Sequence, residues 1–246
     1  MPAERDHVDP AWVETLRRAG LDSHTVWTHP RLRVWRSIRE RDNAVLDGFG
    51  PRLHVKRHRP ARGVAPAELE AAGHRLLVEA GIPTFELAAW GVMADGRSYS
   101  VAVDLSGFQP ADRLISRGRV DFAAIAEPTA RIARALHAAG LHHRDLYLCH
   151  FLVNPADLDV RLIDVGRVRR LPIWFARRWI VKDLAQFWFS AVRVGVPEPM
   201  LVGWLERAGG ATRLRAVRRK AASIARRDRR LARTSPERDV SLDPLD

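Results

Sequence analysis

Apolar and polar residues alternate through residues 31–58, which is the period of a β-strand with one buried face. The pair Asp47-Gly48 interrupts the alternation and favours a tight turn, and Leu53 and Val55 continue the apolar series beyond it. The pattern therefore predicts a strand, a turn and a second strand. Lys56 falls on the face of this second strand opposite Leu53 and Val55.

Helical signals stand on either side of these strands. Asp9, Pro10 and Gly20 are typical of the two ends of a short helix over residues 9–20. A longer helix is predicted from Pro66 to about Ala80, where Gly81-Ile82-Pro83 would end it. Two more strands are predicted after it, over Phe85–Trp90 and Ser98–Asp104.

The remainder of the chain has the spacing of amphipathic helices. Helices are predicted over residues 121–139, 174–194, 199–208 and 213–233. The first hundred residues therefore consist mostly of strands with one main helix, and the rest is mostly helical. This arrangement indicates the α+β class of fold.

The composition is that of an ordinary globular protein. The chain has 246 residues, of which 46% are hydrophobic and 28% charged, so it can bury a sizeable core. A transmembrane helix is not expected, because no window holds about 18 uncharged apolar residues. No secretory signal is evident at the N-terminus. A single cysteine, Cys149, excludes an intramolecular disulfide and a zinc site built from cysteines, which suits a cytoplasmic setting.

The formal net charge of +12 favours an anionic partner. Only three of the 41 basic residues are lysines, so Lys56 attracts more attention than any one arginine. The segment from Arg213 to Arg233 is strongly basic. It is either a solvated helix face or a surface that binds an anionic membrane or phosphorylated lipid.

The most informative residues are those that phosphoryl transfer requires. Residues 143–152 read HRDLYLCHFL, and residues 162–168 read LIDVGRV. Lys56 lies upstream on a predicted strand, and Glu70 lies on the next helix. Phosphoryl transfer needs a lysine on the nucleotide phosphates, a carboxylate that holds the lysine, one aspartate for the acceptor hydroxyl and one for Mg²⁺.

These motifs resemble the lipopolysaccharide core kinases, the WaaP/Kdo-kinase family, which have a protein-kinase-like fold. Residues 181–185 (VKDLA) and 81–84 (GIPT) support the resemblance, which covers roughly residues 20–235. It implies a bilobal architecture, with an N-terminal helical extension (1–25), a β-rich N-lobe (26–103) and a helical C-lobe (104–246). The C-lobe would include the basic helix at about 211–233.

The resemblance also implies a role for each motif residue. Lys56 is expected to contact the ATP phosphates, with Glu70 as its ion-pair partner and Glu68 and Glu79 as rival partners. Asp145 is expected to be the catalytic aspartate. Asp164 is expected to bind Mg²⁺, Asp183 to brace the catalytic loop, and His143 to be a framework residue. A hinge at Asp104, Leu105 and Ser106 is expected to contact adenine, through its backbone, between the lobes.

The sequence departs from ordinary protein kinases at two places. His150 stands where those enzymes have an asparagine that binds Mg²⁺. An imidazole is a poorer Mg²⁺ ligand than an oxygen, so His150 would contact phosphate or support a site with a single metal ion. No glycine-rich loop precedes Lys56, and residues 39–43 (RERDN) occupy the position of a phosphate-covering turn.

The resemblance implies an ATP- and Mg²⁺-dependent kinase that acts on a heptose or Kdo hydroxyl of the lipopolysaccharide inner core. Its partners would be the core glycolipid and the anionic inner surface of the cytoplasmic membrane, and no nucleic acid is expected. One alternative is a kinase of the same fold with a protein side chain or a small molecule as acceptor. A second is a non-catalytic basic adaptor that binds membrane or nucleic acid.

Overall fold

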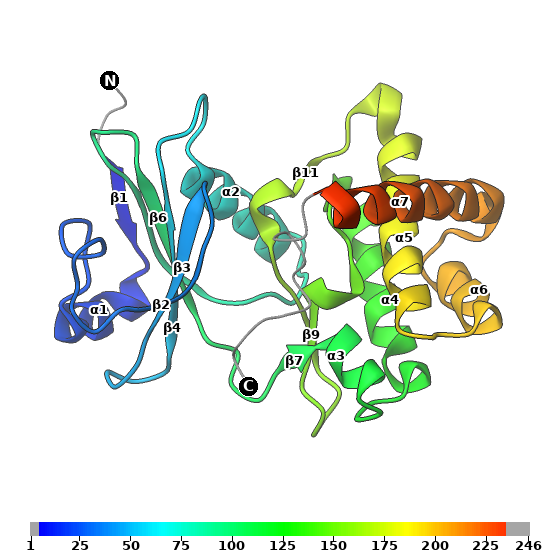
Figure 1. Cartoon of the computed structure of the whole chain (residues 1–246), viewed down its shortest axis with the longest axis horizontal. Coiled ribbons are helices and arrows are strands. Elements are labelled where there is room, and N and C mark those ends of the chain that lie inside the picture. The colour runs from blue at the N-terminus through cyan, green and yellow to red at the C-terminus, as the bar shows by residue number, and fades with distance from the viewer. Residues whose placement is uncertain (1–4, 235–246) are drawn as a thin grey trace. The chain divides into compact units, whose positions relative to one another are not determined.

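The computed structural model describes residues 5–234, and the chain divides into two compact units. The first unit contains the residues up to Arg75 together with Phe85–Ser106. The second contains Leu76–Thr84 and the residues from Gly107 onward. Figure 1 labels the helices and strands of both units.

The first unit is built on one antiparallel sheet of six strands. The strand order is β1-β5-β6-β4-β3-β2. The strands are β1 (Arg5–Val8), β2 (Arg33–Ser37), β3 (Arg41–Leu46), β4 (Leu53–His58), β5 (Leu87–Val92) and β6 (Ser98–Val103). The alternation seen in the sequence is confirmed, because Leu53 and Val55 on β4 are buried in the apolar core.

The N-terminal segment provides much of the apolar layer on one face of this sheet. It contains a 3₁₀ turn η1 (Pro10–Trp12) and the helix α1 (Val13–Ala19). Leu16, Leu21 and Val26 pack in the same cluster as Leu53 and Val55. Strand β1 pairs with β5 and was not predicted. The segment expected as a helical extension is therefore an integral part of the first unit's fold.

The opposite face of the sheet carries polar side chains. Lys56 on β4 stands in register between Asn43 on β3 and Ser100 on β6, so the three residues share one face. Helix α2 (Pro66–Glu79) supplies Glu70 to this face. The expected turn over residues 39–43 is shorter than predicted, because Arg41–Leu46 already form β3.

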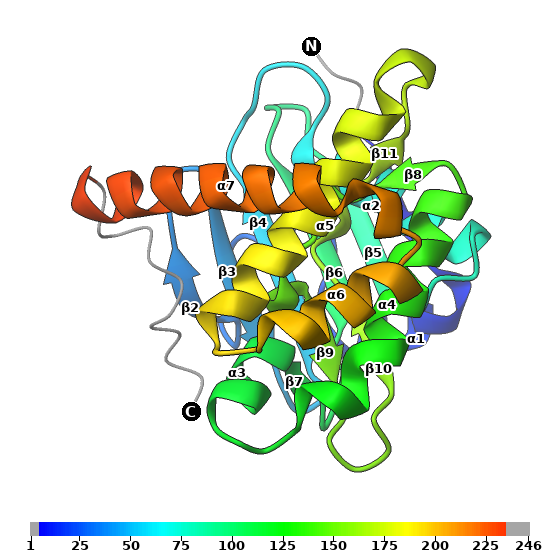
Figure 2. The same cartoon turned by 90° about the vertical axis from the view of Figure 1, so that its right-hand side faces the viewer.

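The second unit is mainly helical, and Figure 2 shows how its helices are arranged. Phe187 stacks on Trp204 with ring centroids 3.7 Å apart. The helices are α3 (Ala111–Ser116), α4 (Phe122–Ala138), α5 (Ala176–Arg193), α6 (Glu198–Arg207) and α7 (Leu214–Thr234). These helices confirm the predicted long helices to within a few residues at each end, and α3 was not predicted.

Short strands and 3₁₀ turns connect the helices and were not predicted. The strands are β7 (Gln109–Pro110), β8 (Leu141–His142), β9 (Phe151–Val153), β10 (Val160–Leu162) and β11 (Arg169–Arg170). The turns are η2 (Leu148–His150), η3 (Val165–Arg167), η4 (Ile173–Phe175) and η5 (Ala211–Arg213). They lie on either side of the motif residues, so they set the positions of the functional side chains.

Strand β5 has no room for a side chain at Gly91. A Cβ atom there would lie 2.5 Å from Cε1 of Tyr99, its partner on β6. We expect Gly91→Ala to lower the free energy of unfolding by about 1–3 kcal/mol, since a rigid ring must shift. Gly203→Ala on α6 is the matched control, because its Cβ meets only the end of Arg207 at 3.8 Å. Thermal unfolding of the two variants compares them, and equal midpoints would contradict the packing argument.

Candidate active site

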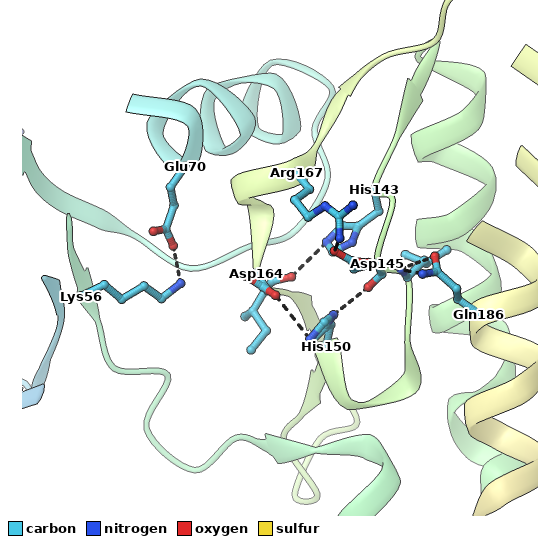
Figure 3. A network of polar contacts seen from close by, with 10 residues as sticks. Lys56, Glu70, His143, Asp145, His150, Asp164, Arg167 and Gln186 are labelled. Atoms are coloured by element: carbon cyan, nitrogen blue, oxygen red, sulfur yellow. Dashed lines mark hydrogen bonds and ion pairs between the residues drawn. The ribbon is translucent and has the colours of Figure 1, made fainter. Parts of the chain in front are cut away.

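Lys56 and Glu70 form an ion pair in the first unit. Lys56 Nζ lies 2.6 Å from Glu70 Oε1 (Figure 3), and Ser100 Oγ donates to Glu70 Oε2 at 2.9 Å. Glu70 is only 4% exposed. A buried carboxylate held by two partners fixes the position of the ammonium group.

The rival glutamates are engaged elsewhere or differently placed. Glu68 pairs with Arg5 at 2.9 Å, and Glu79 is an exposed residue of the second unit. Glu70 is therefore the partner of Lys56, as the sequence predicted.

The expected hinge residues end the first unit. Asp104 donates its backbone N–H to the Arg52 carbonyl at 2.9 Å, and its carboxylate contacts His54 Nε2 at 2.6 Å. Asp104 is thus used to hold β4 and β6 together. Leu105 is half-buried and Ser106 is exposed.

In the second unit, a buried aspartate on α5 holds the loop that follows β8. Asp183 accepts the backbone N–H groups of His143 and Arg144, both at 2.8 Å. Arg144 has φ of +72°, a left-handed conformation that is costly for a residue with a side chain. Burial alone would raise the pKa of Asp183, but the hydrogen bond and charge of His137 and the bond from His143 lower it. The predicted bracing role of Asp183 is confirmed.

Asp145 follows this strained residue and is fixed by two side chains. Its Oδ2 accepts from Arg167 at 2.7 Å and its Oδ1 from Gln186 at 3.3 Å (Figure 3). A carboxylate has about four lone-pair positions, so these two bonds leave acceptor capacity for a substrate hydroxyl. Its carbonyl oxygen contacts Nδ1 of His150 at 2.7 Å.

His150 connects the two aspartates of the motif. Because its Nδ1 donates to the Asp145 carbonyl, its Nε2 faces Asp164, with Oδ2 3.5 Å away. Burial disfavours the charged imidazole, but Cys149, the Asp164 carboxylate and the Asp145 carbonyl outweigh burial and raise the pKa of His150. These contacts favour the protonated imidazole, with Nε2 directed at the Asp164 carboxylate.

His143, in contrast, is a framework residue. It is fully buried, and its Nε2 lies 3.0 Å from the Ile163 carbonyl oxygen. Burial and the nearby charge of His150 lower the pKa of His143. The neutral, buried imidazole of His143 connects the loop that carries Asp145 to the segment that leads into Asp164. This is the framework role that the sequence predicted.

Asp164 stands after strand β10 in a left-handed conformation, with φ of +59°. The chain that follows α2 holds this strand, since the Leu162 N–H donates to the Pro83 carbonyl and Thr84 Oγ1 donates to the Leu162 carbonyl. The Asp164 side chain is 40% exposed. Its carboxylate is a hard oxygen donor that suits Mg²⁺, which binds one or two carboxylates together with phosphate oxygens.

Two further residues support the loop and were not singled out in the sequence. Gln186 and Ser190 lie on α5 at helical spacing from Asp183, and they accept from the N–H groups of Leu146 and Leu148 at 3.3 and 2.8 Å. The signal that could have found them is a row of polar residues at intervals of three and four in a helix whose other buried residues are apolar.

Comparison with known proteins then places this geometry in context. A family model described as "Lipopolysaccharide kinase (Kdo/WaaP) family" matches residues 58–204. The match contains Glu70, Asp145, His150 and Asp164, and it begins just after Lys56.

Curated relatives agree with the family model. The chain is 29% identical to the lipopolysaccharide core heptose(I) kinase WaaP of Pseudomonas aeruginosa over 199 residues, which is 67% of this chain and 72% of the relative. It is 35% identical to the enzyme of the same description from Escherichia coli K12 over 75 residues, 28% of each chain.

A solved structure of WaaP in complex with acyl carrier protein is also similar. The TM-score is 0.67 with 27% sequence identity, and the match covers 94% of this chain and 98% of that one. The predicted α+β, protein-kinase-like fold class is confirmed.

The bonds of Asp183 generate a stability prediction. We expect Asp183→Ala to lower the free energy of unfolding by roughly 2–5 kcal/mol, because two backbone N–H groups would be left without their acceptor. Asp183→Asn, which keeps one acceptor oxygen, should lose less. Asp157→Ala on an exposed turn is the control. Urea denaturation gives the order of the three variants, and a loss for Asp183→Ala no larger than the control's would disprove the bracing role.

Proposed function

Because the chain belongs to the lipopolysaccharide kinase (Kdo/WaaP) family, we propose that it transfers the γ-phosphate of ATP to a heptose hydroxyl of the lipopolysaccharide inner core. The predictions of an ATP-dependent phosphotransferase and of a lipopolysaccharide core sugar as acceptor are confirmed by the family. Heptose is preferred over Kdo because the relatives from Pseudomonas and Escherichia are described as heptose(I) kinases.

The braced Asp145 is the observation that carries the proposal. In phosphoryl transfer the acceptor oxygen forms a bond to the γ-phosphorus while the bond to the bridging oxygen of ADP breaks. Asp145 would accept a hydrogen bond from the acceptor hydroxyl, orient its oxygen in line with the γ-phosphorus and receive its proton. Gln186 and Arg167 would keep the carboxylate at one angle. Holding it in this orientation lowers the activation barrier of phosphoryl transfer, because the reacting groups are already positioned.

Lys56 would contact the ATP phosphates. Its ion pair with Glu70 gives the ammonium group a fixed position, so it can neutralise phosphate charge with little reorganisation. Within the expected hinge, Asp104 uses its N–H and its carboxylate inside the first unit, so its carbonyl and the backbone of Leu105 and Ser106 would meet the adenine.

Asp164 would hold Mg²⁺, and His150 would contact phosphate. Mg²⁺, when bound, would neutralise negative charge on the ATP phosphates. The half-exposed carboxylate of Asp164 fits this ion. Nδ1 of His150 is used by the Asp145 carbonyl and Nε2 faces the Asp164 carboxylate, so of the two roles expected for His150 we favour phosphate binding.

The alternatives receive less support. A non-catalytic adaptor would not require an aspartate with this set of supporting bonds, and the family is one of kinases. A kinase for proteins or soluble molecules would share the same phosphoryl-transfer residues, so the acceptor must be tested directly.

We also propose that the protein works at the inner face of the cytoplasmic membrane, where a glycolipid acceptor would be found. The net charge of +12 suits an anionic surface. Within the described residues, no helix has the length and apolar character needed to cross a bilayer.

The acceptor and the role of Asp145 are tested together. Purified core oligosaccharide incubated with enzyme and ATP should gain one phosphate on a heptose, detected and located by mass spectrometry. Asp145→Ala should lower kcat by about 10²–10⁴-fold with ATP affinity nearly unchanged. Phosphate on Kdo would correct the acceptor, and phosphate on generic protein but not on the oligosaccharide would reject the proposal.

The lysine assignment has a control within the chain. Lys56→Met should lower kcat/KM for ATP by at least about 10²-fold, on the scale of a lost charge contact in the transition state. Glu70→Gln should lower it less, because the lysine remains but loses its fixed position. Lys220→Met, an exposed residue of α7, should have no effect. Normal ATP kinetics in Lys56→Met would place the phosphates elsewhere.

A further inference from the structure

Three large apolar side chains lie side by side on the surface of the second unit. Ile173, Trp174 and Phe175 form the turn η4 and are 90%, 90% and 58% exposed. The other strongly exposed large apolar residues in the described part of the chain are separate valines. Single exposed apolar residues are ordinary, but a contiguous group that includes two aromatic rings marks an interaction surface.

The chain on either side of this turn is basic. Arg170, Arg177 and Arg178 are exposed, and no acidic residue occurs from Val165 to Lys182. An apolar tip with tryptophan among arginines matches a membrane interface, where aromatic rings enter the headgroup level and cations bind anionic lipids. In Figures 1 and 2 the chain between β11 and α5 projects from the top of the second unit.

Both stems of this projection are fixed to the loop that carries Asp145. On one side β11 pairs with β8, and the Leu171 N–H donates to the Gly140 carbonyl at 2.7 Å. On the other side Trp179 packs on His142 with ring centroids 4.7 Å apart, and the Arg144 guanidinium lies 4.7 Å from the Trp179 ring. The tip therefore holds a defined position relative to the catalytic loop.

We propose that residues 170–178 form a membrane-contact tip, in which Ile173, Trp174 and Phe175 enter the interface of an anionic phospholipid bilayer and the three exposed arginines bind its headgroups. The inference rests on the proposed function, since a glycolipid acceptor lies in that bilayer. Ile173 is six residues from Arg167, the partner of Asp145, so extended chain allows at most roughly 22 Å between them. The tip would hold the catalytic aspartate close to the membrane surface.

A second copy of the chain is a weaker candidate for the occupant. Two such tips would bring their exposed arginines together without an acidic partner on either tip, and like charges repel. An anionic bilayer supplies the opposite charge.

Helix α7 is also basic, but it does not present a group of exposed large apolar residues that could enter a bilayer. Its apolar residues Val217, Ala221 and Ile224 are buried, while Arg226 and Arg227 are exposed. It would add attraction that salt screens, whereas the tip would add burial of aromatic surface in the bilayer. The two contributions can be separated by experiment.

Vesicle flotation of the full chain tests the tip. Binding is measured with phosphatidylcholine vesicles and with vesicles in which part of that lipid is replaced by phosphatidylglycerol. We expect the double variant Trp174→Ala/Phe175→Ala to bind the anionic vesicles about tenfold more weakly, with an unchanged midpoint of thermal unfolding because both rings are exposed. Val192→Ala, an exposed apolar residue 51% accessible on α5, is the control and should bind like the wild type.

Quenching separates insertion from adsorption. Phospholipids brominated on their acyl chains should quench part of the tryptophan fluorescence of the wild type, and Trp174→Phe should lose most of that component while it still binds. Equal vesicle binding by the double variant and the wild type would overturn the proposal, and so would quenching that Trp174→Phe leaves unchanged. Loss of self-association in the double variant without loss of vesicle binding would assign the tip to a second copy.

These measurements need neither ATP nor an acceptor sugar. If the oligosaccharide assay fails while the tip still inserts, the acceptor is wrong and the membrane site stands. If phosphate transfer to soluble oligosaccharide succeeds while vesicle binding ignores the tip, the proposed function stands and the tip proposal falls.

Discussion

The loop that carries Asp145 depends on one buried carboxylate. Asp183 accepts two adjacent backbone N–H groups at 2.8 Å, and this holds Arg144 in a left-handed conformation that its side chain disfavours. The strain turns the chain so that Asp145 faces Arg167 and Gln186 while Leu146 is buried. Helix α5 thereby fixes the angle of the carboxylate that we propose to be catalytic, and such positioning is what phosphoryl transfer requires.

The sequence predicted those parts of the molecule that local pattern determines. The alternation around Leu53 and Val55 placed Lys56 on the polar face of its strand, and the pairing with Glu70 followed from the motif. The strand β1 and the two- and three-residue strands of the second unit could not be predicted, because their pairing is set by distant partners rather than by period. The spacing of Gln186 from Asp183 is visible in the sequence, but the N–H group that its amide oxygen accepts belongs to Leu146, and only the folded loop shows this bond.

The basic charge of the chain has more than one physical role. Arg167 holds a carboxylate, Arg144 lies over the Trp179 ring, and Arg218 of α7 pairs with Glu198 of α6. These arginines serve the fold and the site. Those near Trp174 and on the outer face of α7 lie at the surface, and they account for the part of the net charge that would favour an anionic partner. Composition alone could not separate the two groups.

His150, which stands where protein kinases have an asparagine, can also be understood from its contacts. An asparagine would offer Asp164 an amide and a metal an oxygen, whereas His150 offers a charge. Its Nδ1 is held by the Asp145 carbonyl, so its Nε2 points at Asp164. Burial lowers the pKa of the ring, but Cys149 and these acceptors raise it by more. If Asp164 holds the Mg²⁺ proposed for it, a protonated imidazole fixed beside that carboxylate would add positive charge next to the phosphates, which an asparagine amide could not do.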